Sequence, residues 1–167
     1  MTTGLLVVLS CCHDLRRHND QRPCSSIGRA AALHTVTKGD VTVLKVAAAL
    51  AERGERILMP FSSNERYDLA LDRSGALFRV QCKTGRLKNG AVTFNTCSST
   101  AHHVSGTMKQ YVGDIEAFGV YCPQTNNVYL VPIADVSHVK RMARLRVDPT
   151  KNGQAYNVRH AAIYLVA

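Results

Sequence analysis

The stretch that decides the fold is residues 66–85, which read RYDLALDRSGALFRVQCKTG. Two runs in which apolar and polar residues alternate, 66–72 and 76–84, flank the sequence Arg-Ser-Gly at 73–75. Alternation with a period of two is typical of β-strands, and the glycine-containing connection is typical of a tight turn. The stretch therefore predicts a β-hairpin.

Alternation along this hairpin predicts that polar side chains gather on one face. Gln81, Lys83 and Arg79 point to the same side of the second strand. A turn centred near Ser74 places Asp68 roughly opposite Gln81, and cross-strand neighbours lie about 5 Å apart at Cβ. A carboxylate, an amide oxygen and an ammonium group are therefore expected to converge on one patch of the sheet.

These three groups suit the hydrolysis of a phosphodiester. Asp68 offers a hard anionic oxygen to Mg²⁺, and Gln81 offers an amide oxygen to the metal or to a metal-bound water. Lys83 can lower the pKa of the attacking water and stabilise negative charge at phosphorus. The alternative is an ordinary sheet surface with solvated side chains, because an aspartate followed at a distance by Gln-x-Lys is a loose pattern.

The rest of the chain predicts a single domain of the α/β (α+β) class. Asp40 is expected to cap a helix whose apolar residues continue to Leu50 at helical spacing, and Gly54 is expected to end it. This order of a helix, several strands and a second helix indicates a mixed fold. The further strands are expected over 56–59, 91–95, 115–121, 127–131 and 163–166, and the second helix over 134–142.

Composition favours a globular protein with a polyanionic partner. The chain has 167 residues, 46% of them hydrophobic, and 21 Lys and Arg against 12 Asp and Glu, a net charge of +9. This content excludes wholesale disorder, and the lack of an apolar run of membrane length argues against a transmembrane helix. The charge favours nucleic acid first and a membrane surface second.

Residues 1–36 differ from the rest and are expected to form a disordered leader before a domain at 37–167.

None of the six cysteines forms a CxxC pair, which argues against a zinc site. Cys82 and Cys122 lie inside predicted strands and are expected to be buried thiols in a reducing cytoplasm. If the polyanionic partner is DNA, the protein is expected to lie in the cytoplasm with the nucleoid.

Several short motifs follow one another in a distinctive order. They are KGD at 38–40, RYDL at 66–69, RVQCKTG at 79–85, YVGDIE at 111–116, FGVY at 118–121, NVYLVP at 127–132, LR at 145–146 and NGQ at 152–154. This series resembles the PD-(D/E)xK nuclease superfamily, in particular the group I intron-associated homing endonucleases that carry QxK in place of ExK. The resemblance spans about residues 37–167. It implies a restriction-endonuclease-like core, in which helices flank a central mixed β-sheet.

The resemblance assigns roles residue by residue. Asp68 matches the metal-binding aspartate, Gln81 the position that is Glu in most of the superfamily, and Lys83 the catalytic lysine. It also implies that Mg²⁺, or Mn²⁺ as an alternative, is the cofactor for cleavage of double-stranded DNA. One site per chain favours a dimer or tetramer that places two sites across the duplex.

One position departs from the family pattern. The family has a glutamate on the first helix, where this chain has Val43, which cannot bind a metal. Asp40 and Glu65 are candidate replacements, and Thr42 offers a hydroxyl. The departure favours a single Mg²⁺ bound by Asp68, waters and a DNA phosphate, and it puts the rate of catalysis in question.

Basic residues cluster after the predicted active strand and again near residue 140. From residue 73 to residue 109 there are six basic residues and no acid. Such stretches suit DNA phosphates, although a solvated basic face is the alternative for each. The pair His102-His103 is interpreted as exposed loop histidines. The candidate DNA-binding residues are Arg79, Arg86, Lys88, Lys109, Lys140, Arg141, Arg144 and Arg146.

Three functions share these features. The first is a divalent-metal-dependent DNA endonuclease, and the second is a degenerate relative that binds DNA without cutting it, which Val43 favours. The third is a Holliday-junction resolvase or repair nuclease on the same fold. A basic RNA-binding or membrane-surface module is the least favoured alternative.

Overall fold

The computed structural model describes residues 35–62, 64–99, 108–149, 153 and 158–166. Of the predicted leader at 1–36, residues 1–34 lie outside the described residues, whereas Thr35 and Val36 already belong to the first helix. The pair His102-His103, and Asn152 and Gln154, also lie outside the described residues.

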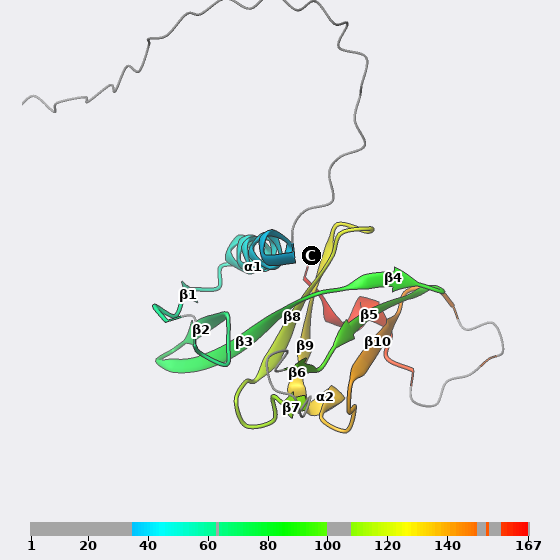
Figure 1. Cartoon of the computed structure of the whole chain (residues 1–167). Helices are drawn as coiled ribbons and strands as arrows, with labels where there is room; N and C mark the ends of the chain where they lie inside the picture. The colour runs from blue at the N-terminus through cyan, green and yellow to red at the C-terminus, as the bar shows by residue number, and fades with distance from the viewer. Residues whose placement is uncertain (1–34, 63, 100–107, 150–152, 154–157, 167) are drawn as a thin grey trace, which may run out of the picture. The chain divides into compact units, whose positions relative to one another are not determined.

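A six-stranded mixed sheet forms the centre of the domain (Figure 1). Strands β3 and β8 pair in parallel, and the other neighbouring strands of this sheet pair antiparallel. The predicted central mixed sheet is therefore confirmed. In spatial order its strands are β1 (Ile57–Leu58), β2 (Leu69–Arg73), β3 (Ala76–Thr84), β8 (Ala117–Cys122), β9 (Asn127–Pro132) and β11 (Leu165–Val166).

Helix α1 (Thr35–Glu52) covers one face of this sheet, where Val46 and Leu50 pack against Leu69 and Val80. The helix begins five residues before Asp40, so the predicted cap at Asp40 is wrong. Contacts inside the molecule support this early start. Thr42 Oγ1 donates to the Lys38 carbonyl at 2.9 Å and lies 2.6 Å from Thr84 Oγ1, which ties the first turns of α1 to β3.

Gly119 on β8 allows α1 to approach the sheet closely. A Cβ atom at Gly119 would lie 2.6 Å from Val46 Cγ1 and 3.2 Å from Val80 Cγ1, and both valines are fully buried. Gly119→Ala is therefore expected to lower the free energy of unfolding by about 1–3 kcal/mol, measured by urea denaturation. The control is Gly39→Ala in α1, where nothing lies within 4 Å of the new methyl group. That change is expected to raise stability by about 0.5–1 kcal/mol, and equal stability of the Gly119→Ala and wild-type proteins would contradict the packing argument.

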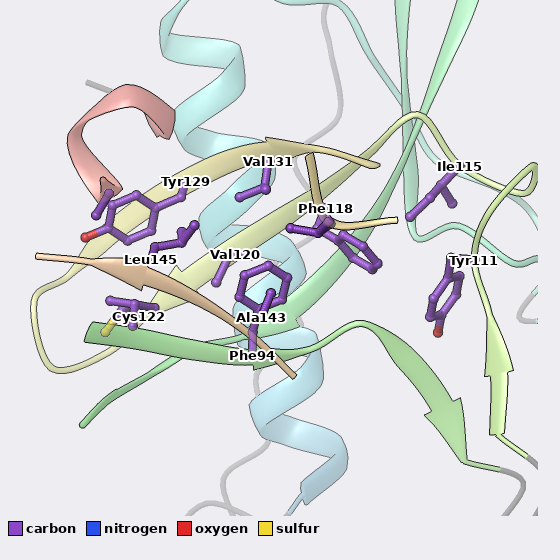
Figure 2. Packing of buried hydrophobic residues seen from close by; sticks show 13 residues of the cluster. Phe94, Tyr111, Ile115, Phe118, Val120, Cys122, Tyr129, Val131, Ala143 and Leu145 are labelled. Carbon is purple, nitrogen blue, oxygen red and sulfur yellow. The ribbon is translucent and has the colours of Figure 1, made fainter. Parts of the chain in front are cut away.

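A second, smaller sheet covers the opposite face. It contains β10 (Met142–Arg146), β5 (Ala91–Asn95) and β4 (Arg86–Lys88), and a separate ribbon contains β6 (Cys97–Ser99) and β7 (Met108–Gln110). Phe94 and Leu145 of the small sheet pack with Phe118 and Tyr129 of the large sheet in one buried cluster (Figure 2). The site residues on β3 lie on the face of the large sheet that this cluster occupies, because Gln81 pairs with Phe118.

Several predicted bounds need correction. The strand at 91–95 is confirmed as β5, but the helix expected over 134–142 is wrong. Only Ile133–Val136 is helical (α2), and Met142–Arg146 is a strand because Ala143 and Leu145 alternate inward against β5. A 3₁₀-helix, η1 (Ala161–Tyr164), precedes the short β11 where a longer last strand was expected.

The hairpin forms as predicted, but its first strand begins at Leu69 and not at residue 66. The Asp68 amide still donates to the Val80 carbonyl at 3.0 Å. Beyond this point the Asp68 carboxylate, not a backbone carbonyl, accepts the Cys82 N–H at 2.7 Å. The Asp68 side chain, which was predicted to bind the metal, therefore ends the regular series of backbone hydrogen bonds between the two strands.

The three cysteines among the described residues, Cys82, Cys97 and Cys122, are buried free thiols, as predicted for Cys82 and Cys122. In the part of the chain that the structure describes, α1 and the shorter helices lack the length and apolar character needed to cross a bilayer.

Candidate active site and nucleic-acid interface

Asp68 and Gln81 meet across the hairpin as the sequence predicted. The register pairs Leu69 with Val80, which sets Asp68 opposite Gln81. The Gln81 side-chain amide donates to Asp68 Oδ2, and the backbone N–H of Cys82 donates to the same oxygen. The carboxylate is therefore fixed by two donors from β3.

The environment of Asp68 raises the pKa of its carboxyl group above the ordinary value. Burial of the carboxylate is the main cause. The Cys82 N–H, the positive charge of Lys83 and the Gln81 amide act in the opposite direction and only partly offset it. A divalent cation would supply the compensation that these groups leave incomplete.

Lys83 lies on the same face of β3 and is half-buried. Its Nζ donates to the hydroxyl oxygen of Tyr111 at 3.0 Å and lies 4.6 Å from the centre of the Tyr111 ring. Tyr111 was not among the site residues expected from the sequence, and its contact with Lys83 was missed. Twenty-eight positions separate the two residues, and strand alternation carries no information at that range.

The structure separates the candidates for the missing acid. Asp40 on α1 and Glu65 in the loop before β2 are both exposed. Val43 is half-buried against the cluster between α1 and the sheet. The described residues contain no group of three or more His, Cys, Asp or Glu side chains arranged to hold a metal. The hydroxyl of Thr42 faces Thr84, whose side chain points away from the Gln81 face of β3.

The residues that are present fit one hard divalent cation. Both hydrogen bonds to the Asp68 carboxylate end at Oδ2, and the described residues provide no donor to Oδ1. Gln81 uses only its amide nitrogen in these contacts, so its carbonyl oxygen is available. Carboxylate and amide oxygens with several retained waters form a donor set that Mg²⁺ accepts.

A cleft of about 850 Å³ connects Lys83 with the small sheet. Its cations are Lys38, Lys83 and Arg86, and the described residues that line it include no acid. Hydroxyl and amide side chains complete the polar lining, and several of them are donors suited to phosphate oxygens. They are Thr42, Thr84, Thr93, Asn95 and Gln124.

The outer face of the small sheet joins two of the predicted basic clusters. Arg86 and Arg144 both pair with Thr93, so they lie on either side of it in one row across the three strands. Lys88 and Arg146 flank Ala91 in the next row. We call Arg86, Lys88, Arg144 and Arg146 the basic face. Neighbouring strands lie about 4.8 Å apart, so the Cα atoms of each pair are separated by about 10 Å across β5.

The other predicted DNA-binding residues occupy different surroundings. The guanidinium of Arg79 forms a bidentate ion pair with Glu116, in which Nη2 donates to Oε1 at 2.7 Å and Nε donates to Oε2 at 3.2 Å. This pairing lowers the pKa of Glu116 and compensates the charge of Arg79. Lys109 on β7 and Lys140 and Arg141 before β10 are exposed. The charge of Arg79 is thus already paired with Glu116, whereas these other cations are accessible to a ligand.

Comparison with known proteins decides the family. A family model described as PD-(D/E)XK endonuclease matches residues 33–167. The chain belongs to the PD-(D/E)XK endonuclease family. The bacterial homing endonuclease I-Ssp6803I has a similar structure, with a TM-score of 0.64 and 20% sequence identity over 78% of this chain and 88% of that chain. No curated protein matches the chain.

These findings confirm the predicted family and the homing-endonuclease type of PD-(D/E)xK fold. The individual roles of Asp68, Gln81 and Lys83, and of the basic residues, stay predictions from the motif and the geometry.

Proposed function

We propose that the protein is a divalent-metal-dependent DNA endonuclease that hydrolyses phosphodiester bonds in double-stranded DNA. The observation that carries the proposal is that Lys83, two residues after Gln81, lines the same cleft as Arg86 of the basic face, and the described residues that line this cleft include no acid. Phosphate groups held along this face would therefore be directed toward Lys83, which lies on the same face of the hairpin as Asp68 and Gln81. Such a substrate would place the protein in the cytoplasm with the nucleoid. The domain that carries this activity would span residues 37–167.

In the proposed reaction, a water oxygen attacks phosphorus, the bond between phosphorus and one sugar oxygen breaks, and the leaving oxygen takes a proton. Asp68 and Gln81 would hold Mg²⁺, which supplies Lewis-acid activation of water and charge neutralisation at phosphate. The ammonium group of Lys83 would stabilise negative charge that develops on the phosphate oxygens. The Cys82 N–H would keep the Asp68 carboxylate in place.

One such site per chain cuts one strand at a time. Cleavage of both strands at one locus is expected to need a dimer or tetramer with two sites across the duplex. Light scattering of the free protein and of its DNA complex measures this directly.

The test of the proposed function is nicking of supercoiled plasmid. With Mg²⁺, or with Mn²⁺ as the second choice, the wild-type protein is expected to convert supercoiled DNA into nicked and linear forms, and a chelator is expected to stop the conversion. Because a homing-type enzyme cuts few sites, the assay should include a library of randomised plasmid inserts. Tight DNA binding without cleavage of any substrate in either metal would reject the proposal.

The basic face predicts a specific dependence of DNA affinity on salt. The double change Arg86→Ala with Arg144→Ala removes two cations that flank Thr93. It is expected to weaken DNA binding by about 10-fold at moderate salt and to reduce the slope of log K against log salt by about 2. Fluorescence anisotropy across a salt series measures both values. Arg53→Ala, an exposed cation just after the end of α1, is the matched control, and an equal effect of the control would show that the basic face has no special role.

A second candidate is a DNA-binding relative that has lost catalysis. Two observations favour it: Val43 replaces the family's helix acid, and Asp68 is the one carboxylate of the site among the described residues. Strong DNA binding by fluorescence anisotropy, together with no products in the nicking assay, would select this alternative.

A further inference from the structure

We propose that Tyr111 is a positioning residue for Lys83 and that its hydroxyl group holds the Lys83 ammonium in the orientation needed for phosphodiester cleavage. The proposal rests on the proposed endonuclease function and assigns a new role within the same site.

The contact between the two side chains is specific. Lys83 Nζ donates to the Tyr111 hydroxyl oxygen at 3.0 Å, and among the described residues no other hydrogen-bond partner of Nζ is found. An ammonium group has three N–H donors. One donor is used by Tyr111, so two are left for phosphate oxygens. A lysine side chain has four flexible bonds, and a fixed contact at its tip removes most of that freedom before the substrate binds.

Tyr111 is itself held rigidly. Its side chain is only 4% exposed, and its ring packs edge-on against Phe118 with 5.6 Å between ring centres. Figure 2 shows Tyr111 at one end of the buried cluster, beside Ile115. Because Phe118 pairs with Gln81 across β3 and β8, the tyrosine is anchored to the strand pair that carries the site.

Arg66 fixes Tyr111 from its other side. The guanidinium carbon lies 4.2 Å from the centre of the Tyr111 ring. Its three nitrogen atoms donate to the side chain of Asp114 at 2.9 Å, to Ser98 at 2.8 Å and to the Gln110 carbonyl at 2.7 Å. These partners lie on β6, at the end of β7 and just after Tyr111.

The planar fork of arginine suits this combination of stacking and three directed hydrogen bonds. Arg66 precedes Asp68 by two residues, so the segment that carries the aspartate also supports the tyrosine. A chain of contacts therefore runs from the ribbon through Arg66 and Tyr111 to Lys83.

The decisive variant is Tyr111→Phe, which removes the hydroxyl and keeps the buried ring. At saturating DNA the rate constant of cleavage is expected to fall about 10-fold, with DNA affinity and melting temperature unchanged. In a Lys83→Ala background the same change is expected to have no further effect on the rate, because the positioned group is gone. Tyr129→Phe, another buried tyrosine of the same cluster, is the control and is expected to leave the rate unchanged.

A second measurement does not depend on cleavage. Acylation of lysines by acetic anhydride, followed by mass spectrometry, reports how strongly each amine is held. Lys83 is expected to react several-fold faster in Tyr111→Phe than in the wild type, with exposed Lys88 and Lys109 unchanged as internal references. Unchanged labelling of Lys83 would overturn the positioning role, as would equal rate losses with and without Lys83. If the wild type cleaves no DNA, the endonuclease proposal fails, while the labelling result still decides whether Tyr111 holds Lys83.

Discussion

Asp68→Asn is expected to abolish Mg²⁺-dependent cleavage while leaving the protein folded. The change removes the one anionic ligand proposed for the cation and keeps the size and shape of the side chain. Loss of metal activation costs several kcal/mol of transition-state stabilisation, so the cleavage rate is expected to fall on the order of 10³-fold. Single-turnover cleavage of a plasmid or oligonucleotide substrate measures this rate.

The same variant is expected to respond differently to Mg²⁺ in thermal unfolding. If Mg²⁺ binds the folded wild type as proposed, the melting temperature should rise with the logarithm of the Mg²⁺ concentration above the dissociation constant. The amide that replaces the Asp68 carboxylate has no charge with which to hold the ion. A melting temperature of the variant that rises with Mg²⁺ as steeply as that of the wild type would contradict the role of Asp68. Asp72→Asn on β2 is the matched control, because Asp72 caps the hairpin turn through the Gly75 N–H at 2.9 Å and is not part of the site.

The sign of the pH dependence follows from burial of Asp68. Because burial raises the pKa of the folded carboxyl above its unfolded value, the folded state holds more protons between these two values. Without metal, this group therefore makes the wild type less stable as pH rises through the raised pKa. The Asp68→Asn variant has no carboxyl group at this position, so it does not lose stability in this way. It is expected to be more stable than the metal-free wild type at neutral pH. This difference should shrink as pH falls from the folded pKa of Asp68 to its unfolded pKa.

The hairpin was predictable because local residues set its register. Ser74 and Gly75 both adopt positive φ, at 54° and 87°, which is the conformation that a two-residue hairpin turn requires. With the turn fixed, alternation alone places Asp68 opposite Gln81. Family motifs added the expected fold, which the comparisons confirm.

The small sheet was not predictable in the same way. Its strand β10 pairs with β5, from which it is separated by more than forty residues, and no local turn joins them. The sequence before β10 also has apolar residues at helical spacing, so a helix over 134–142 was the natural local interpretation. Only the partner strand decides that Ala143 and Leu145 face inward, and that Arg144 faces out beside Thr93.

The same limit explains why the contacts around Lys83 were missed. Its partner Tyr111 and the supporting Arg66 come from separate segments, brought together only by packing on Phe118 and by the ribbon. Pattern reasoning assigns such a tyrosine to the core, which is where its ring lies. The hydroxyl group reaches the site, and no periodicity in the sequence reports that.

Lys83→Ala is expected to separate catalysis from DNA binding. If the ammonium stabilises charge in the transition state, its removal should lower the rate at saturating DNA on the order of 10²–10³-fold. DNA affinity should fall by less than about 10-fold, because Lys83 is one of several cations that line the cleft. The effect of Mg²⁺ on melting temperature should be unchanged, since Asp68 and Gln81 are intact.

The contrast with a simple anchoring role is what makes this variant informative. A lysine that only holds a DNA phosphate contributes equally before and during the reaction, so its loss raises the apparent KM and leaves kcat intact. Lys88→Ala on β4 provides that pattern for comparison, because Lys88 is an exposed cation of the basic face. A Lys83→Ala variant with a raised KM and a wild-type kcat would place Lys83 with the basic face and remove it from the catalytic group. A loss confined to kcat would assign it to the transition state, where its fixed position beside Tyr111 has its effect.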